Sequence, residues 1–160
     1  MDEILSYFPE NIKNIIKENL IKDIEEIRFR LNKPIILKNY NIEKIIKYKL
    51  SNEEMIHILQ KICDNSIYSY QNQICNGYIT LKGGNRVGIV GSTVIKDGQV
   101  TNIKNISSLN FRIARQILNC SKKLLPYILK QDENNIYNTL IVSPPRTWQN
   151  YYFTRFSKKN

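Results

Sequence analysis

Two glycine-containing turns divide residues 78–115 into short segments in which apolar and polar side chains alternate. Gly83-Gly84-Asn85 and Asp97-Gly98 both suit the positive-φ positions of tight hairpin turns. Alternation with a period of two is the pattern of strands that bury one face. The sequence therefore predicts a mostly antiparallel, hairpin-rich sheet. Its expected strands are residues 78–82, 86–95, 99–104 and 108–114.

Two short helices are expected at the start of the chain, over residues 2–8 and 9–20. Pro9 suits the first position of a helix, and four apolar residues spaced three or four apart form one stripe on the second segment. The stripe consists of Ile12, Ile15, Ile16 and Leu20. The two helices are therefore expected to pack as a hairpin.

Strands and helices are also expected between residues 26 and 77. Residues 27–31 alternate apolar and basic side chains and turn at residues 32–34 into an apolar segment, which predicts a β-hairpin. The remaining elements are a strand at 45–48, a helix from the capping box at Ser51 to about Asp64, and a helix from Ser66 to Gly77. Together these patterns predict an α+β fold.

Side chains for catalysis or metal binding are sparse. His57 is the only histidine, and Cys63, Cys75 and Cys120 are widely spaced with no Cys-x-x-Cys pair. A metal site, a disulfide framework and a nucleophilic triad are therefore not expected. The sequence has no apolar run of bilayer length and begins with acidic residues, so we expect a cytosolic protein.

Basic residues outnumber acidic ones by 24 to 14, which gives a net charge of +10. Such a charge favours nucleic acid or an anionic membrane as a partner. One alternative is a small nucleic-acid-binding module, supported by ten tyrosines and by the Gly-x-x-Gly outline of Gly88-Ile89-Val90-Gly91. Another is an interaction domain whose basic, aromatic tail, residues 146–160, binds a membrane surface.

Residues 138–147 have the pattern that begins a phosphate-binding loop. The apolar segment 139–142 predicts a buried parallel strand, and a helix is expected before it over residues 121–130. In phosphate loops such a strand leads into a turn, Gly-Lys-Ser/Thr follows, and a helix begins. Here Trp148-Gln149-Asn150 stands in place of that motif. The remnant of the loop is Ser143, Pro144, Pro145, Arg146 and Thr147.

The codons of residues 148–157 allow the missing motif to be read in a shifted frame. Tryptophan has the single codon TGG, so a shift of one nucleotide through Trp148 and Gln149 forces glycine. The same shift permits lysine and then threonine, which gives Ser-Pro-Pro-Arg-Thr-Gly-Lys-Thr at phosphate-loop spacing. We therefore expect residues 148–160 to be an out-of-frame, disordered tail that follows a one-base insertion or an equivalent deletion.

The body of the chain resembles the N-terminal region of the stage III sporulation protein AA family, ATPases of endospore-forming Firmicutes. The resemblance covers most of residues 1–147, and its most specific block is residues 103–115. The other matching stretches are residues 26–30, 76–80, 83–88 and 138–145.

The resemblance implies an accessory α+β domain over residues 1–130 and the start of a P-loop ATPase domain over residues 131–147. The family is similar to the motor ATPases of type II and type IV secretion, which work as hexameric rings. A homo-oligomer, a membrane-anchored sporulation partner and a cytoplasmic place at the channel between mother cell and forespore are therefore implied. The intact family uses ATP and Mg²⁺. This chain lacks the Walker A glycine-lysine-threonine and the Walker B motif, so we expect it to be inactive and to bind no cofactor.

Arginines on the polar phase of the expected strands are candidates for contacts to a neighbouring subunit or its nucleotide. The planar guanidinium group forms paired hydrogen bonds with carboxylate or phosphate. The alternative is a sheet face that water covers. The candidates are Arg112 and Arg115, followed by Arg28, Arg30 and Arg86.

Overall fold

The computed structural model describes residues 1–114, 125–130, 135–140 and 142. The chain divides into two compact units, Met1–Ala114 and Arg115–Asn160. The first unit contains a six-stranded sheet, and the described part of the second contains one short helix. Each unit is therefore described by itself.

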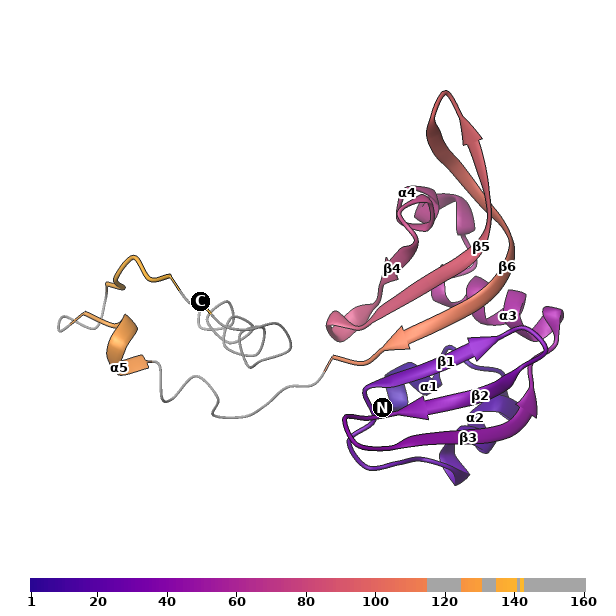
Figure 1. The fold of residues 1–160 in the computed structure, drawn as a ribbon, viewed down its shortest axis with the longest axis horizontal. Coiled ribbons are helices and arrows are strands. Elements are labelled where there is room, and N and C mark those ends of the chain that lie inside the picture. The colour runs from indigo at the N-terminus through magenta and orange to yellow at the C-terminus, as the bar shows by residue number, and fades with distance from the viewer. Residues whose placement is uncertain (115–124, 131–134, 141, 143–160) are drawn as a thin grey trace. The chain divides into compact units, whose positions relative to one another are not determined.

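Six strands of the first unit form one antiparallel sheet in the order β3-β2-β1-β6-β5-β4 (Figure 1). Each half of this order is a meander of consecutive strands, and β6 lies beside β1 and joins the halves. The expected α+β class with an antiparallel, hairpin-rich sheet is confirmed. The strands are β1 (Glu26–Arg30), β2 (Pro34–Lys38), β3 (Glu43–Lys49), β4 (Tyr78–Thr80), β5 (Arg86–Lys96) and β6 (Gln99–Arg112).

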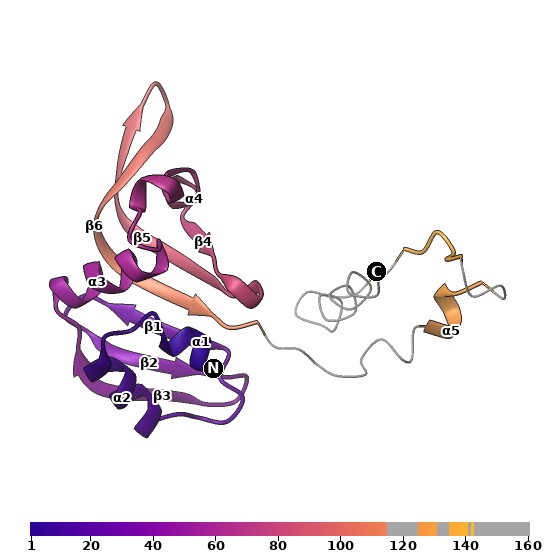
Figure 2. The ribbon, with the colours of Figure 1, turned by 180° about the vertical axis from the view of Figure 1, so that it is seen from behind.

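The helices of this unit lie on one face of the sheet (Figures 1 and 2). The expected capping box is present: the Ser51 hydroxyl accepts a hydrogen bond from the Glu54 N–H, and the Glu54 carboxylate accepts one from the Ser51 N–H. The helical elements are α1 (Asp2–Leu5), α2 (Glu10–Glu18), α3 (Asn52–Ile62), η1 (Ile67–Tyr70), α4 (Gln71–Cys75) and η2 (Lys82–Gly84).

Three phenylalanine rings form the centre of the core between the helices and the sheet. The Phe8 ring packs edge to face on Phe29 and on Phe111, with centroid distances of 5.1 and 5.0 Å. Phe29 and Phe111 also meet edge to face at 5.6 Å. Phe8 follows α1, whereas the other two rings belong to β1 and β6, so the cluster holds the first helix against the joint between the halves of the sheet.

The helices differ from the sequence prediction at their ends. α1 ends at Leu5, and Pro9 is the N-cap of α2 instead of its first residue. α2 ends before Leu20, whose side chain is exposed, so the buried stripe is shorter than expected. The segment expected as one helix from Ser66 begins as a 3-10 turn, in which the Ser66 hydroxyl pairs with that of Ser69 and caps no helix.

The long hairpin of β5 and β6 bends at Gly91. Val90 pairs with Ser108, whereas Ser92 pairs with Lys104, so the register between the two strands shifts at a bulge. A Cβ atom on Gly91 would lie 2.6 Å from the Lys104 carbonyl oxygen, so a larger residue does not fit. Two strands were expected over residues 99–104 and 108–114, but β6 is one continuous strand, and the residues between Lys104 and Ser108 form the bulge. The Asp97-Gly98 turn closes the hairpin as expected.

The described part of the second unit contains α5 (Leu125–Ile128) and a bridge between Leu129 and Ile136. The expected strand at 139–142 is not formed at Thr139, Leu140 or Val142, and the last two side chains are exposed. An apolar parallel strand is stable only between neighbouring strands, and none lies beside these residues in the described part of the chain. The expected tail, residues 148–160, lies outside the described residues.

Candidate functional site

The face of the sheet opposite the helices carries a cluster of arginines. Along β1, Ile27 and Phe29 are buried in the core, so the intervening residues point to the other face. The same alternation in β5 and β6 places Arg86 and Arg112 there. The structure thus brings together four of the five predicted arginines: Arg28, Arg30, Arg86 and Arg112.

Register places Arg112 between a carboxylate and a second arginine. Glu26 of β1 lies directly opposite it on one side, and Arg86 of β5 lies directly opposite it on the other. Like charges in such cross-strand positions repel each other. The Arg86 guanidinium carbon also lies 5.5 Å from the centre of the Tyr78 ring, at a distance typical of a cation–π contact.

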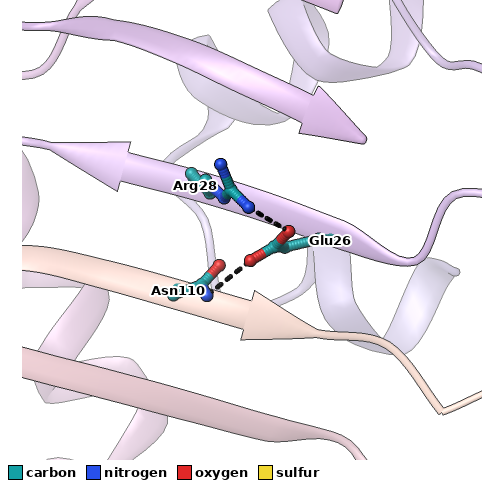
Figure 3. Close-up of polar contacts among 3 residues, drawn as sticks. All are labelled: Glu26, Arg28 and Asn110. Carbon is teal, nitrogen blue, oxygen red and sulfur yellow. Dashed lines mark hydrogen bonds and ion pairs between the residues drawn. The ribbon is translucent and has the colours of Figure 1, made fainter. Parts of the chain in front are cut away.

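Glu26 forms the centre of a hydrogen-bonded cluster (Figure 3). One of its carboxylate oxygens accepts a hydrogen bond from Arg28 Nη2 at 2.7 Å, and the other accepts one from Asn110 Nδ2 at 2.6 Å. The Asn110 Oδ1 atom is buried and has no hydrogen-bond partner among the described residues. Both oxygens of Glu26 are therefore engaged within the sheet.

These contacts set the charge state of the cluster. Burial raises the pKa of the Glu26 carboxyl, but hydrogen bonds from Arg28 and Asn110, with the charges of Arg28 and Lys38, outweigh it and hold the pKa below its ordinary value. The hydrogen bond to Glu26 raises the pKa of Arg28 despite partial burial. Glu26 is therefore ionised at neutral pH and compensates Arg28.

Arg30 lies on the same face but at the far end of β1 from Glu26, and the remaining predicted site residues are not among the described ones. Arg30 lies opposite Ser108, whose hydroxyl donates a hydrogen bond to the Phe29 carbonyl oxygen at 2.9 Å. Arg115 lies outside the described residues. The same holds for the phosphate-loop remnant Ser143, Pro144, Pro145, Arg146 and Thr147.

Sequence reasoning did not identify Glu26, Tyr78 or Asn110 as members of the cluster. All three alternate with buried residues, which places them on the same face as the arginines. That signal was present in the sequence. The sequence does not indicate which residues they contact, because those contacts depend on which strands are neighbours in the sheet.

The histidine, the buried cysteine and the two glycines considered in the sequence analysis do not form a catalytic, metal or RNA-binding site in the described residues. His57 is exposed on α3. Cys63 is buried, and burial, with the charge of Asp64, raises the pKa of its thiol to about 11, so the thiol is protonated at neutral pH. Gly88 and Gly91 lie within β5, so they do not form an RNA-binding loop. Within the part of the chain that the structure describes, His, Cys, Asp and Glu side chains nowhere gather in threes that could hold a metal ion.

A polar cluster also joins the N-terminal helices to the sheet. Tyr48 and Asn11 both donate hydrogen bonds to Glu54 Oε1, at 2.5 and 2.7 Å. Burial raises the pKa of the Glu54 carboxyl, but the hydrogen bonds from Tyr48, Ser51 and Asn11 hold it below its ordinary value. This cluster connects α2, β3 and α3, and it is structural.

Comparison with known proteins gives a match along most of the chain. Residues 1–154 match the family described as Sporulation stage III, protein AA. Stage III sporulation protein AA of Bacillus subtilis (strain 168) is 37% identical over 150 residues, which are 92% of this chain and 48% of that protein. The chain therefore spans about half the length of this curated relative.

Two solved structures show a weaker likeness. The ATPase DotB of Legionella pneumophila is 14% identical, with a TM-score of 0.42 over 78% of this chain and 35% of that one. The VirB11 ATPase of the Brucella suis type IV secretion system, in complex with sulphate, is 11% identical, with a TM-score of 0.36 over 89% of this chain and 40% of that one. None of the helices in the described residues has the length and apolar character that crossing a bilayer requires.

Proposed function

Because this chain belongs to the Sporulation stage III, protein AA family, we propose that it is the accessory part of a motor ATPase that energises a channel between mother cell and forespore. The observation that carries the proposal is the match over residues 1–154. In this role the first unit, Met1–Ala114, assembles subunits into a ring and contacts a membrane-anchored partner from the cytoplasm.

The proposal includes a change of reading frame at Trp148. The phosphate-loop pattern runs through Thr147 and then stops, although the shifted codons supply glycine and permit lysine and threonine. Without that glycine and lysine, the loop loses the close approach of its backbone and the positive charge on the β- and γ-phosphates. The chain as written therefore neither binds ATP tightly nor hydrolyses it, and ATP and Mg²⁺ belong to the intact family member.

The arginine cluster is the part of the first unit that suits a contact between subunits. Arg28 is compensated by Glu26, whereas Arg86 and Arg112 are exposed and lie next to each other. We assign Arg112, with Arg115, to a carboxylate of the neighbouring subunit or to the phosphates of its nucleotide. Arg30 and Arg86 support that contact from the same face.

Restoring the reading frame tests the proposal. The gene is resequenced around the codons for Thr147 and Trp148, and the frame-restored, full-length protein is titrated with a fluorescent ATP analogue in the presence of Mg²⁺. The expected result is nucleotide binding and hydrolysis, both lost when the restored loop lysine is replaced by alanine. A frame-restored protein that folds, contains the intact loop and binds no nucleotide would contradict the proposal.

A further inference from the structure

Positive charge in the first unit is concentrated on the sheet face opposite the helices, which we name the open face. Residues 1–114 contain sixteen basic and twelve acidic side chains. Up to the β5–β6 bulge at Gly91, strand alternation and register place seven of the basic and two of the acidic side chains, Glu26 and Glu43, on the open face. The basic ones are Arg28, Arg30, Lys38, Lys47, Lys49, Arg86 and Arg112. The rest of the unit has nine basic and ten acidic side chains, so the excess of positive charge lies entirely on one face.

Apolar side chains are interspersed among these charges. Ile45 of β3, Val90 of β5 and Tyr78 of β4 lie on the open face and are 59%, 57% and 42% exposed. Arginine and aromatic residues are enriched at protein–protein interfaces, and apolar area buried in an interface supplies much of its affinity. The mixture suits a partner that offers both carboxylates and apolar side chains.

The carboxylates of the open face do not neutralise its arginine pair. Glu26 binds Arg28 and Asn110 with its two oxygens, although it lies opposite Arg112 in the register. Arg86 faces Arg112 across β5 and β6, and stacks on Tyr78. An external anion bound by this pair would relieve its repulsion.

We propose that the open face binds an acidic protein surface that also carries apolar side chains. A nucleic acid suits this face less well, because its backbone is uniformly anionic, whereas a protein surface can leave the position opposite Glu26 uncharged and place apolar side chains against Ile45 and Val90. An anionic membrane suits it less well because its headgroups place negative charge against the whole face, Glu26 and Glu43 included. The inference rests on the proposed function, since it specifies the partner of the same arginines, but it does not require the restored frame.

The experiment uses the full chain as written and two synthetic acidic polypeptides. Binding to labelled poly-L-glutamate and to a labelled copolymer of glutamate and tyrosine is measured by fluorescence anisotropy at one fixed ionic strength. We expect the copolymer to bind more tightly, because its aromatic side chains contact the apolar part of the face. The double variant Arg86→Gln/Arg112→Gln is expected to weaken copolymer binding about tenfold or more.

A matched variant removes the same charge elsewhere. Lys17 and Lys61 are exposed residues in the last turns of α2 and α3, and Lys17→Gln/Lys61→Gln is expected to leave copolymer binding within about twofold. If the arginine double variant does not fold, Arg30→Gln/Lys47→Gln on the same face replaces it. Circular dichroism confirms that each variant folds.

Several outcomes would overturn the inference. Equal loss in the two double variants would mean that net charge, not the open face, determines binding. Equal binding of the two polypeptides would remove the role of the apolar side chains. Tighter binding of single-stranded oligo-dT, or of phosphatidylserine vesicles, that the arginine variant abolishes would assign the face to nucleic acid or lipid. Failure of the frame-restored protein to bind nucleotide would affect the proposed function alone.

Discussion

Arg86 and Arg112 occupy directly opposite positions on neighbouring antiparallel strands, on the face of the sheet that no helix of the first unit covers. Two cations at such a position repel each other unless an anion lies between them. The isolated chain therefore has an unfavourable interaction that binding of an acidic group would relieve.

Replacing Arg112 with alanine in the frame-restored protein is expected to lower the ATPase rate about tenfold or more, because arginine placed on a phosphate or carboxylate stabilises charge that alanine cannot. The measurement is the steady-state ATPase rate, with assembly followed by light scattering. Lys17→Ala, on the helical face, is the control. An unchanged rate and unchanged assembly in Arg112→Ala would leave that arginine without the assigned role.

Glu26→Gln is expected to lower the free energy of unfolding by about 1–3 kcal/mol, because it removes a charged acceptor of two hydrogen bonds in a half-buried cluster. Urea unfolding at neutral pH measures the change. Glu43→Gln, at an exposed position of β3, is the control and should change the stability little.

The same variant gives a pH signature. The pKa of Glu26 is lower in the folded protein than in the unfolded chain, so its ionised form stabilises the fold above the ordinary glutamate pKa of about 4.3. That contribution disappears as the pH falls through the folded-state pKa. The stability difference between the wild-type protein and Glu26→Gln should therefore be constant at neutral pH and shrink below about pH 4. A difference that grew with acid would contradict this assignment.

Gly91→Ala is expected to destabilise the protein by about 1–3 kcal/mol, because the added Cβ would meet the Lys104 carbonyl oxygen at 2.6 Å and Ile103 Cγ2 at 2.8 Å. Gly88→Ala is the matched control in the same strand, since its Cβ would lie 3.8 Å from the nearest atom. Thermal unfolding of both variants tests the difference. Equal melting temperatures would mean that the bulge adjusts without cost.

Tyr48→Phe is expected to cost about 1 kcal/mol, because it removes the hydrogen bond donated to Glu54 and the one accepted from Asn11 while it leaves the ring in place. Removing this donor should also raise the pKa of Glu54 toward its ordinary value. Side-chain carboxyl resonances followed by NMR during an acid titration measure that shift. Tyr40→Phe, at an exposed bend, is the control.

Local chemistry made several elements predictable from the sequence. The capping box at Ser51 and the turn at Asp97-Gly98 depend only on residues within a few positions, and both formed as expected. Alternation identified the polar face of β1, and with it Arg28 and Arg30. These patterns depend on neighbouring residues alone, and the structure confirms the elements that they predicted.

Contacts between distant segments could not be predicted in this way. Glu26 meets Asn110 because β6 pairs with β1 in one particular register, and alternation does not specify which strands become neighbours. At residues 139–142 a local pattern predicted a strand that the described residues of this segment do not form. Its apolar composition suits a strand, but composition cannot supply the neighbours that a strand needs.

The pairing of β6 with β1 also has a consequence for synthesis on the ribosome. Glu26 and Asn110 are 84 positions apart, so the first three strands emerge long before the strand that completes their sheet. Until residues 108–112 leave the exit tunnel, β1 has a free edge that can pair with the wrong chain. Nascent chains arrested before this point should therefore depend on chaperones, and release of that dependence should coincide with the emergence of β6.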